Sequence, residues 1–188
     1  MSKNTVLALV GSLRADSHNR KLAEAIQLNA PENVEVQIHG SLGNIPFYNE
    51  DIDVEGKVPA EAAALRAAAA KADTLLFVTP EHNGTLTASL KNAIDWLSRP
   101  YGAGALAGKP TAVVGTAFGQ FGGVWAQDEA RKAAGIAGAK VLDNVKLAVP
   151  GSMVRFAELH PKDDTEVVEQ IKAIFEPLTA VQEEEAAA

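Results

Sequence analysis

The chain has 188 residues, of which 47% are hydrophobic and 22% are charged, a composition typical of one globular domain with a sizeable core. Its formal net charge of −7 argues against a general nucleic-acid-binding protein, and the absence of cysteine excludes disulfides and thiolate metal sites. No apolar run approaches the roughly 18 residues that a membrane-spanning helix needs. The first residues show no signal-peptide pattern, so we expect a cytoplasmic protein without membrane partners.

Strand and helix patterns alternate along the whole chain, which predicts an α/β fold with a mainly parallel sheet. The strands are expected at residues 4–10, 34–39, 73–79, 110–116 and 140–149. The helices are expected at residues 17–29, 59–71, 87–98, 122–136 and 163–180. We expect a single domain over residues 1–182 and a disordered tail over residues 183–188.

The apolar patterns of the strands also predict their order in the sheet. The first, third and fourth strands are continuous apolar runs, typical of strands buried on both faces. The second and fifth strands alternate instead, as expected at sheet edges. Val34, Val36 and Ile38 are expected on one face of the second, and Val141, Val145, Leu147 and Val149 on one face of the fifth. These patterns predict a flavodoxin-like three-layer sandwich with a five-stranded parallel sheet in the order 2-1-3-4-5. In this order, the direction in which strands are added to the sheet reverses between the first and third strands, and ligands bind in the crevice at the carboxyl ends of these strands.

The loop after the first strand is the strongest candidate binding site. The apolar run at residues 6–10 ends in a stretch that contains Ser12, Arg14, Ser17 and Asn19. Hydroxyls, an amide and a guanidinium are gathered here just before a helix, whose free N–H groups and dipole favour an anion. The stretch therefore predicts a phosphate site. The alternative is that Ser17 is only a helix N-cap and Arg14 only a solvated charge.

Two common phosphate motifs are absent from this stretch. There is no Gly-x-x-x-x-Gly-Lys-Ser/Thr run, and the turn holds one glycine, Gly11, where a dinucleotide fingerprint needs three. A mononucleotide bound without a metal remains, and the ribityl phosphate of a flavin fits this description.

Two later loops should meet the first at the same sheet edge. Residues 79–87 are polar and rich in turn formers, and their main-chain groups could bond a planar polar ring; the alternative is an ordinary turn capped by Thr87. Residues 115–123 contain glycines that allow close backbone approach, with a flexible loop as the alternative. His82 has no Ser–Asp or metal-ligand partners at a suitable spacing, so we assign no catalytic side chain and no metal site. A flavin would carry redox chemistry by itself.

Three stretches together resemble the NADPH-dependent FMN reductase family, in the branch of bacterial quinone, chromate and azo-dye reductases. They are residues 11–20, residues 80–83 with 90–99, and residues 119–123, and residues 45–51 resemble the family's loop after the second strand. The resemblance implies bound FMN, NADPH or NADH as hydride donor, and a small-molecule electron acceptor such as a quinone or free flavin. It also implies a homodimer or homotetramer, with the helix over 90–99 contributing to the subunit contact. Trp96 on that helix is equally consistent with plain core.

The resemblance also implies roles for ten residues of this sequence. The phosphate would be held by Ser12, Arg14, Ser17 and Asn19. The isoalloxazine would be lined, chiefly through main chain, by Pro80, Glu81, His82 and Asn83. The pocket would be completed by Thr116 and Gly119.

The sequence departs from the family at two places. His82 stands where the family usually has Tyr, which makes it a candidate substrate contact, and Thr87-Ala88 replaces a common Pro-Gly. Two other functions remain open: a flavodoxin-type electron carrier, which Arg14 in the first loop disfavours, and a non-catalytic flavoprotein interaction module.

Overall fold

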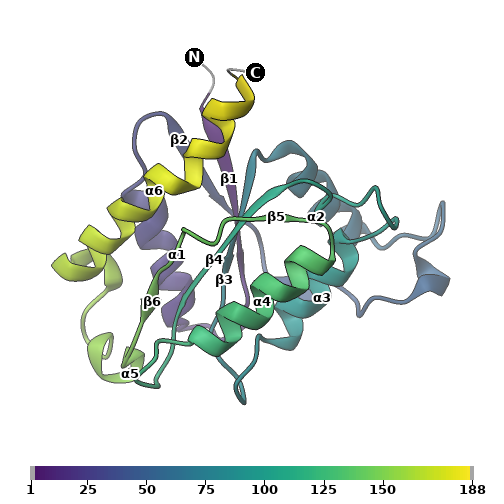
Figure 1. Cartoon of the computed structure of the whole chain (residues 1–188). Coiled ribbons are helices and arrows are strands. Elements are labelled where there is room, and N and C mark those ends of the chain that lie inside the picture. Colours follow the sequence, from purple (N-terminus) through teal and green to yellow (C-terminus); the bar gives the residue numbers. More distant parts are fainter. Residues whose placement is uncertain (1–2, 187–188) are drawn as a thin grey trace.

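The computed structural model describes residues 3–186 and shows a three-layer α/β sandwich around a parallel sheet (Figure 1). The hydrogen-bonded order is β2-β1-β3-β4-β5, which confirms the predicted order, and a sixth short strand also pairs with β4. The strands are β1 (Asn4–Val10), β2 (Val34–Ile38), β3 (Thr74–Val78), β4 (Pro110–Thr116), β5 (Lys140–Val141) and β6 (Ala148–Val149).

Helices cover both faces of this sheet (Figure 1). One layer contains α1 (His18–Leu28) and α6 (Thr165–Ala186), and the other contains α2 (Ala60–Lys71), α3 (Ala88–Leu97) and α4 (Val124–Ile136). The remaining helices are short: α5 (Ser152–Arg155) and the 3-10 turns η1 (Leu42–Asn44), η2 (Glu50–Ile52) and η3 (Pro161–Asp163).

The strand patterns explain how the two layers share the sheet. Val6 and Ala8 of β1 pack into the core beneath α1 and α6, whereas Leu7 and Leu9 pack into the core on the opposite face. A continuous apolar run is therefore buried on both sides, as predicted. The edge strand β2 alternates between buried valines and exposed polar residues, which confirms its predicted place at the edge.

The fifth strand differs from the prediction, because residues 140–149 form two short strands instead of one. Thr111 of β4 is paired with Val141 of β5, and Gly115 is paired with Ala148 of β6. Between these two pairs the chain advances four residues along β4 (115 − 111) but seven residues from β5 to β6 (148 − 141). Three extra residues bulge out of the ladder between the two strands.

A buried arginine occupies the place where the ladder is broken. Arg131 of α4 donates from Nη2 to the carbonyl of Val113 at 2.8 Å and lies 3.5 Å from the carbonyl of Val145. The guanidinium thus satisfies carbonyls that a continuous strand would have paired. Val145 packs in the α1 and α6 core, while Val141 packs on the other side, so the single predicted face of this strand is wrong.

The loop after β2 is tied to α3 by two buried side chains. Asn92 donates to the carbonyls of Ile45 and Pro46 and accepts from the N–H of Tyr48. The indole of Trp96 donates to the carbonyl of Pro46 at 2.7 Å and is fully buried. Trp96 could belong to a subunit contact or to the core, and its full burial within the chain confirms the core interpretation.

Two further expectations concern membrane-spanning helices and the C-terminal tail. Within residues 3–186, no helix is both long and apolar enough to cross a membrane. The tail predicted over 183–188 falls on the end of α6 as far as Ala186, and residues 187–188 lie outside the described part of the chain. The disorder of this tail stays a prediction.

Candidate functional site

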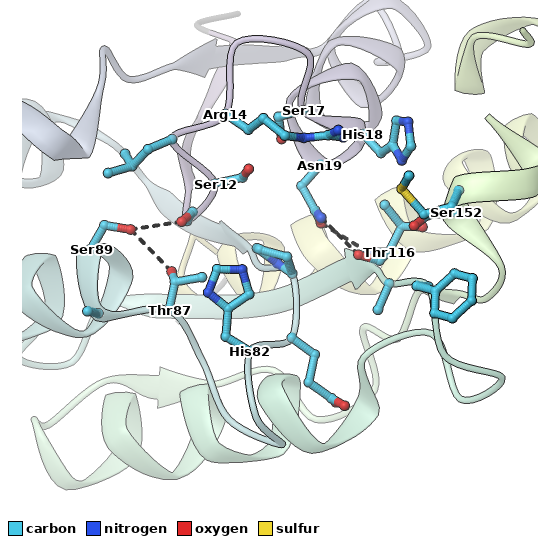
Figure 2. A pocket seen from close by; sticks show the side chains of 18 residues that line it. Ser12, Arg14, Ser17, His18, Asn19, His82, Thr87, Ser89, Thr116 and Ser152 are labelled. Atoms are coloured by element: carbon cyan, nitrogen blue, oxygen red, sulfur yellow. Dashed lines mark hydrogen bonds between the residues drawn. The ribbon is translucent and has the colours of Figure 1, made fainter. Parts of the chain in front are cut away.

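A cavity of about 540 Å³ lies at the carboxyl ends of β1, β3 and β4 (Figure 2). Its volume falls within the roughly 300–1,000 Å³ of typical small-molecule sites. Eight of the ten predicted site residues line it, whereas Asn83 and Gly119 do not. The eight are Ser12, Arg14, Ser17, Asn19, Pro80, Glu81, His82 and Thr116.

One end of the cavity is the N-terminus of α1. The hydroxyl of Ser17 caps this helix by accepting from the N–H of Arg20 at 3.1 Å. The N–H groups of His18 and Asn19, in the first turn, have no carbonyl within the helix to bond. Arg14 is exposed and is the one lysine or arginine among the described lining residues. Free N–H groups, a helix dipole and a guanidinium therefore meet at one end of the cavity, an arrangement suited to a phosphate.

His18 also lines this end, although it was not among the residues predicted to form the site. Its ring is buried and packs edge-on against Phe156, with the ring centroids 5.9 Å apart. Burial lowers the pKa of the His18 imidazole, and the nearby charges of Arg14 and Lys21 lower this pKa further. The neutral form of His18 is thus favoured, so the positive charge at this end comes from Arg14. The sequence signal that could have identified His18 is its position as the first helical residue after the predicted N-cap, Ser17.

Asn19 and Thr116 are bonded to one another across the cavity floor (Figure 2). The amide nitrogen of Asn19 donates to the carbonyl of Thr116 at 2.8 Å, and the Thr116 N–H donates back to the Asn19 side-chain oxygen at 3.0 Å. The Thr116 hydroxyl donates to the carbonyl of Val149 at 2.8 Å. Two of the predicted cofactor residues therefore have polar groups that are engaged within the protein.

The loop after β3 closes as a tight hairpin. His82 and Thr85 exchange hydrogen bonds of 3.0 and 3.1 Å, and the two central residues, Asn83 and Gly84, have φ angles of 53° and 76°. An Asn-Gly pair with positive φ at both positions is typical of a type I′ turn. Asn83 forms the tip of the turn, outside the cavity lining. Because the His82 main chain is engaged in the turn, its imidazole is the part free to meet a ligand.

Glu81 connects this hairpin to α4. Its carboxylate accepts from the N–H of Ala126 at 3.3 Å, in the first turn of α4. The helix has Gly123 at its N-cap and no capping side chain of its own there. Glu81 therefore serves as the cap that α4 lacks, and the charge is favourable beside a helix N-terminus.

A second group of hydroxyls joins α3 to the end of β1 (Figure 2). The hydroxyl of Ser89 donates to the carbonyl of Gly11 at 2.8 Å and lies 3.2 Å from the hydroxyl of Thr87. Thr87 is also the N-cap of α3, as the sequence suggested, and accepts from the N–H of Leu90. A Cβ at Gly11 would lie 2.6 Å from the Thr87 oxygen, so a larger residue there would displace the hydroxyl that caps α3. Ser89 carried no recognisable sequence signal, because its bond to Gly11 depends on the tertiary fold.

The far wall comes from the loop after β4 and from α5. Ser152 and Met153 of α5 line the cavity, as does Phe118, whose side chain is largely exposed at the rim. A Cβ at Gly115 would lie 2.1 Å from the carbonyl oxygen of Thr79, so β3 and β4 approach closely only because glycine stands there. Sequence reasoning missed α5, since four residues give no periodic pattern.

This donor set fits FMN better than a metal or a hydrolytic centre. The α1 end offers N–H groups and one guanidinium to a dianion, and the other walls offer polar and apolar groups to a ring system. Among the described residues, no cluster of three His, Asp or Glu side chains could hold a metal ion.

Comparisons with known proteins point the same way. Residues 4–153 match the model of the family described as NADPH-dependent FMN reductase. A quinone reductase from Pseudomonas putida is 46% identical over 129 residues, which are 68% of each chain. An NAD(P)H-dependent FMN reductase from Pseudomonas aeruginosa is 42% identical over 128 residues, 68% of this chain and 67% of that protein. The solved structure of the flavoenzyme NAD(P)H:(acceptor) oxidoreductase FerB from Paracoccus denitrificans superposes with a TM-score of 0.77 at 28% identity, over 94% and 98% of the two chains.

Proposed function

This chain belongs to the NADPH-dependent FMN reductase family, and we propose from this premise that its cavity is the FMN site of a quinone reductase. The protein is an FMN-dependent NAD(P)H oxidoreductase that acts on quinones. When bound, FMN supplies two-electron redox chemistry between NAD(P)H and the acceptor. The single observation that carries the assignment to this cavity is the free N-terminus of α1 beside Arg14. It lies at the carboxyl ends of β1 and β3, from which the chain continues into helices on opposite faces of the sheet.

The proposed roles of the side chains follow from their positions. The phosphate would be held by Arg14, Ser12 and the first N–H groups of α1. These groups lie together at the α1 end of the cavity, where Arg14 supplies a positive charge. Pro80, the His82 imidazole and the hydroxyls of Thr87 and Ser89 would line the ring end. The carboxylate of Glu81 would fix the hairpin through its bond to α4.

The rim of the cavity supports an aromatic acceptor such as a quinone. Phe118 and Met153 border it and are 71% and 52% exposed. The loop after β4 that carries Phe118 also carries Phe121, which packs against Trp125 with ring centroids 5.7 Å apart. Exposed aromatic faces can stack on a flat ring. His82 lies at the same cavity and would contact the acceptor.

Purified protein reconstituted with FMN tests this function. Without oxygen, addition of NADPH or NADH should bleach the flavin absorbance, and a benzoquinone should then restore it. Flavin that binds but stays oxidised would indicate an electron carrier instead. A protein that takes up no FMN would contradict the assignment of the cavity.

The assembly and location are also proposals. We propose one FMN-binding domain over residues 1–182, a homodimer or homotetramer, and a cytoplasmic location. The domain is supported by the two cores that share one sheet. The oligomer is supported by Phe47 and Tyr101, which are 78% and 90% exposed. Light scattering on the eluted protein should give twice or four times the 19.7 kDa of the chain.

A further inference from the structure

Asn19 lies in the stretch expected to bind phosphate, yet its side chain is already bonded within the protein. It is 4% exposed, and its carboxamide makes both a donor and an acceptor bond to the peptide groups of Thr116, 97 positions further along the chain. We propose that Asn19 is a positioning residue that joins the α1 wall of the cavity to the β4 wall, and that its side chain does not bind the phosphate. This inference rests on the proposed flavin function.

The direction of the side chain supports this role. Figure 2 shows the Asn19 amide directed at Thr116, while Ser12 and Arg14 lie on the loop that precedes α1. The amide oxygen accepts from the Thr116 N–H, and the amide nitrogen donates to the Thr116 carbonyl. The orientation of the carboxamide is fixed by this pair, since a flipped amide would lose both bonds.

The position of Thr116 explains why the bond matters to the cavity. Thr116 is the last residue of β4, and Ala117 and Phe118, which follow it, line the cavity. Its peptide is buried, so loss of Asn19 would leave a buried N–H and a buried C=O without partners. The chain after β4 would then shift to recover bonds, and the distance between the two walls would change.

The positioning role and a direct phosphate contact predict different responses to the loss of the ligand phosphate. Riboflavin has the ring system and ribityl chain of FMN without the phosphate. A side chain that binds phosphate should matter for FMN and not for riboflavin, whereas a side chain that sets the cavity walls should matter for both. Alanine at position 19 keeps the main-chain N–H, so the substitution tests only the side chain.

The experiment titrates FMN and riboflavin into the flavin-free wild type, Asn19→Ala and Arg14→Ala, by quenching of flavin fluorescence. For Asn19→Ala we expect both affinities to fall by a similar factor, about tenfold, the size of one lost buried hydrogen bond. For Arg14→Ala we expect the FMN affinity alone to fall. Loss of FMN affinity in Asn19→Ala with unchanged riboflavin affinity would overturn the proposal.

A matched control is Asn92→Ala. Asn92 is also buried, at 7% exposure, and bonds to main-chain groups far away in sequence, but it does not line the cavity. We expect Asn92→Ala to lower the stability of the protein and to leave the affinities for both flavins within about twofold of wild type. A tenfold fall in this variant as well would mean that general destabilisation explains the Asn19 result, and would count against the proposal.

A measurement without flavin keeps the test decisive. Amide hydrogen exchange of the flavin-free proteins should show faster exchange at residues 116–118 in Asn19→Ala than in wild type, and unchanged protection there would overturn the proposal. If the alanine variant does not fold, Asn19→Asp keeps the acceptor and loses the donor, and it should bind riboflavin more weakly than wild type; equal binding would count against the proposal. A wild type that binds neither flavin would contradict the proposed function, while the exchange data would still report on the Asn19 bond.

Discussion

At the α1 end of the cavity, Ser12, Arg14 and Ser17 come from one short stretch, whereas the opposite walls combine the hairpin after β3, the first turn of α3 and the loop after β4. The first end consists of local helix-terminus groups and one exposed charge. The second depends on close approaches between segments far apart in the chain, such as Ser89 with Gly11. We call these opposite walls the composite end. Substitutions at the α1 end should therefore act on charge and ligand selectivity, and substitutions at the composite end on shape and stability.

The largest effect is expected at the composite end, from Gly115→Ala. The added Cβ would lie 2.1 Å from the carbonyl oxygen of Thr79, a backbone atom that cannot move without shifting β3. We expect a loss of about 3 kcal/mol in the free energy of unfolding, measured with urea, and weaker binding of both FMN and riboflavin. The control is Gly119→Ala, where no atom lies within 4 Å of the added Cβ, and where we expect a change below about 0.5 kcal/mol. Equal stability of the two variants would contradict the close approach.

At the α1 end, Arg14→Ala should cost about 1.5–3 kcal/mol of FMN binding, the contribution of a charge-assisted hydrogen bond. Because Arg14 is exposed, the free energy of unfolding should stay within about 0.5 kcal/mol of wild type. The control is Arg20→Ala, which removes a nearby guanidinium that already pairs with Glu24 at 2.9 Å. If Arg14→Ala and Arg20→Ala bind FMN with the same affinity, the proposed contact of Arg14 with the phosphate is wrong.

The wall formed by α5 should respond to pH. Arg155 of α5 holds both oxygens of Asp164, at 2.5 and 2.8 Å, and these hydrogen bonds lower the pKa of Asp164. A lowered folded-state pKa contributes stability that is fully present above the unfolded pKa of about 4 and is lost as the pH falls through the folded value. We expect Asp164→Asn to lower the free energy of unfolding at pH 7 by about 1.5 kcal/mol and to flatten the loss of stability below pH 4.

Urea unfolding of both proteins between pH 2 and pH 7 checks this prediction. Asp163→Asn is the matched control, because Asp163 is exposed and neighbours Asp164. If the free energy of unfolding falls with pH in the same way in the wild type and in Asp164→Asn, the Arg155–Asp164 pair does not cause the pH dependence.

The smallest effect is expected from His82→Tyr, at the ring end. The FMN affinity should stay within about twofold, because the hairpin is fixed by main-chain bonds and by the Glu81 carboxylate. The KM for a benzoquinone should change by about two- to tenfold, the range of one aromatic contact. Steady-state kinetics with saturating NADPH measures this, and an unchanged KM would show that His82 does not contact the acceptor.

Much of the fold could be predicted from the sequence, because buried strands and amphipathic helices leave clear periodic patterns. The predicted fifth strand failed, since its break depends on Arg131, a residue of α4 that reaches carbonyls of two other segments. In the site, the contiguous α1 end was predictable from its motif. The Asn19 bond to Thr116 and the Ser89 bond to Gly11 were not, because they join residues 97 and 78 positions apart.

A crystal structure of the FMN complex would show directly which end of the cavity holds the phosphate and which holds the ring. We predict the phosphate beside Arg14 and the first N–H groups of α1, the ring between the hairpin at residues 82–85 and α5, and the Asn19 carboxamide still bonded to Thr116. A phosphate bound elsewhere in the cavity, or outside it, would contradict the assignment of the α1 end as the phosphate site.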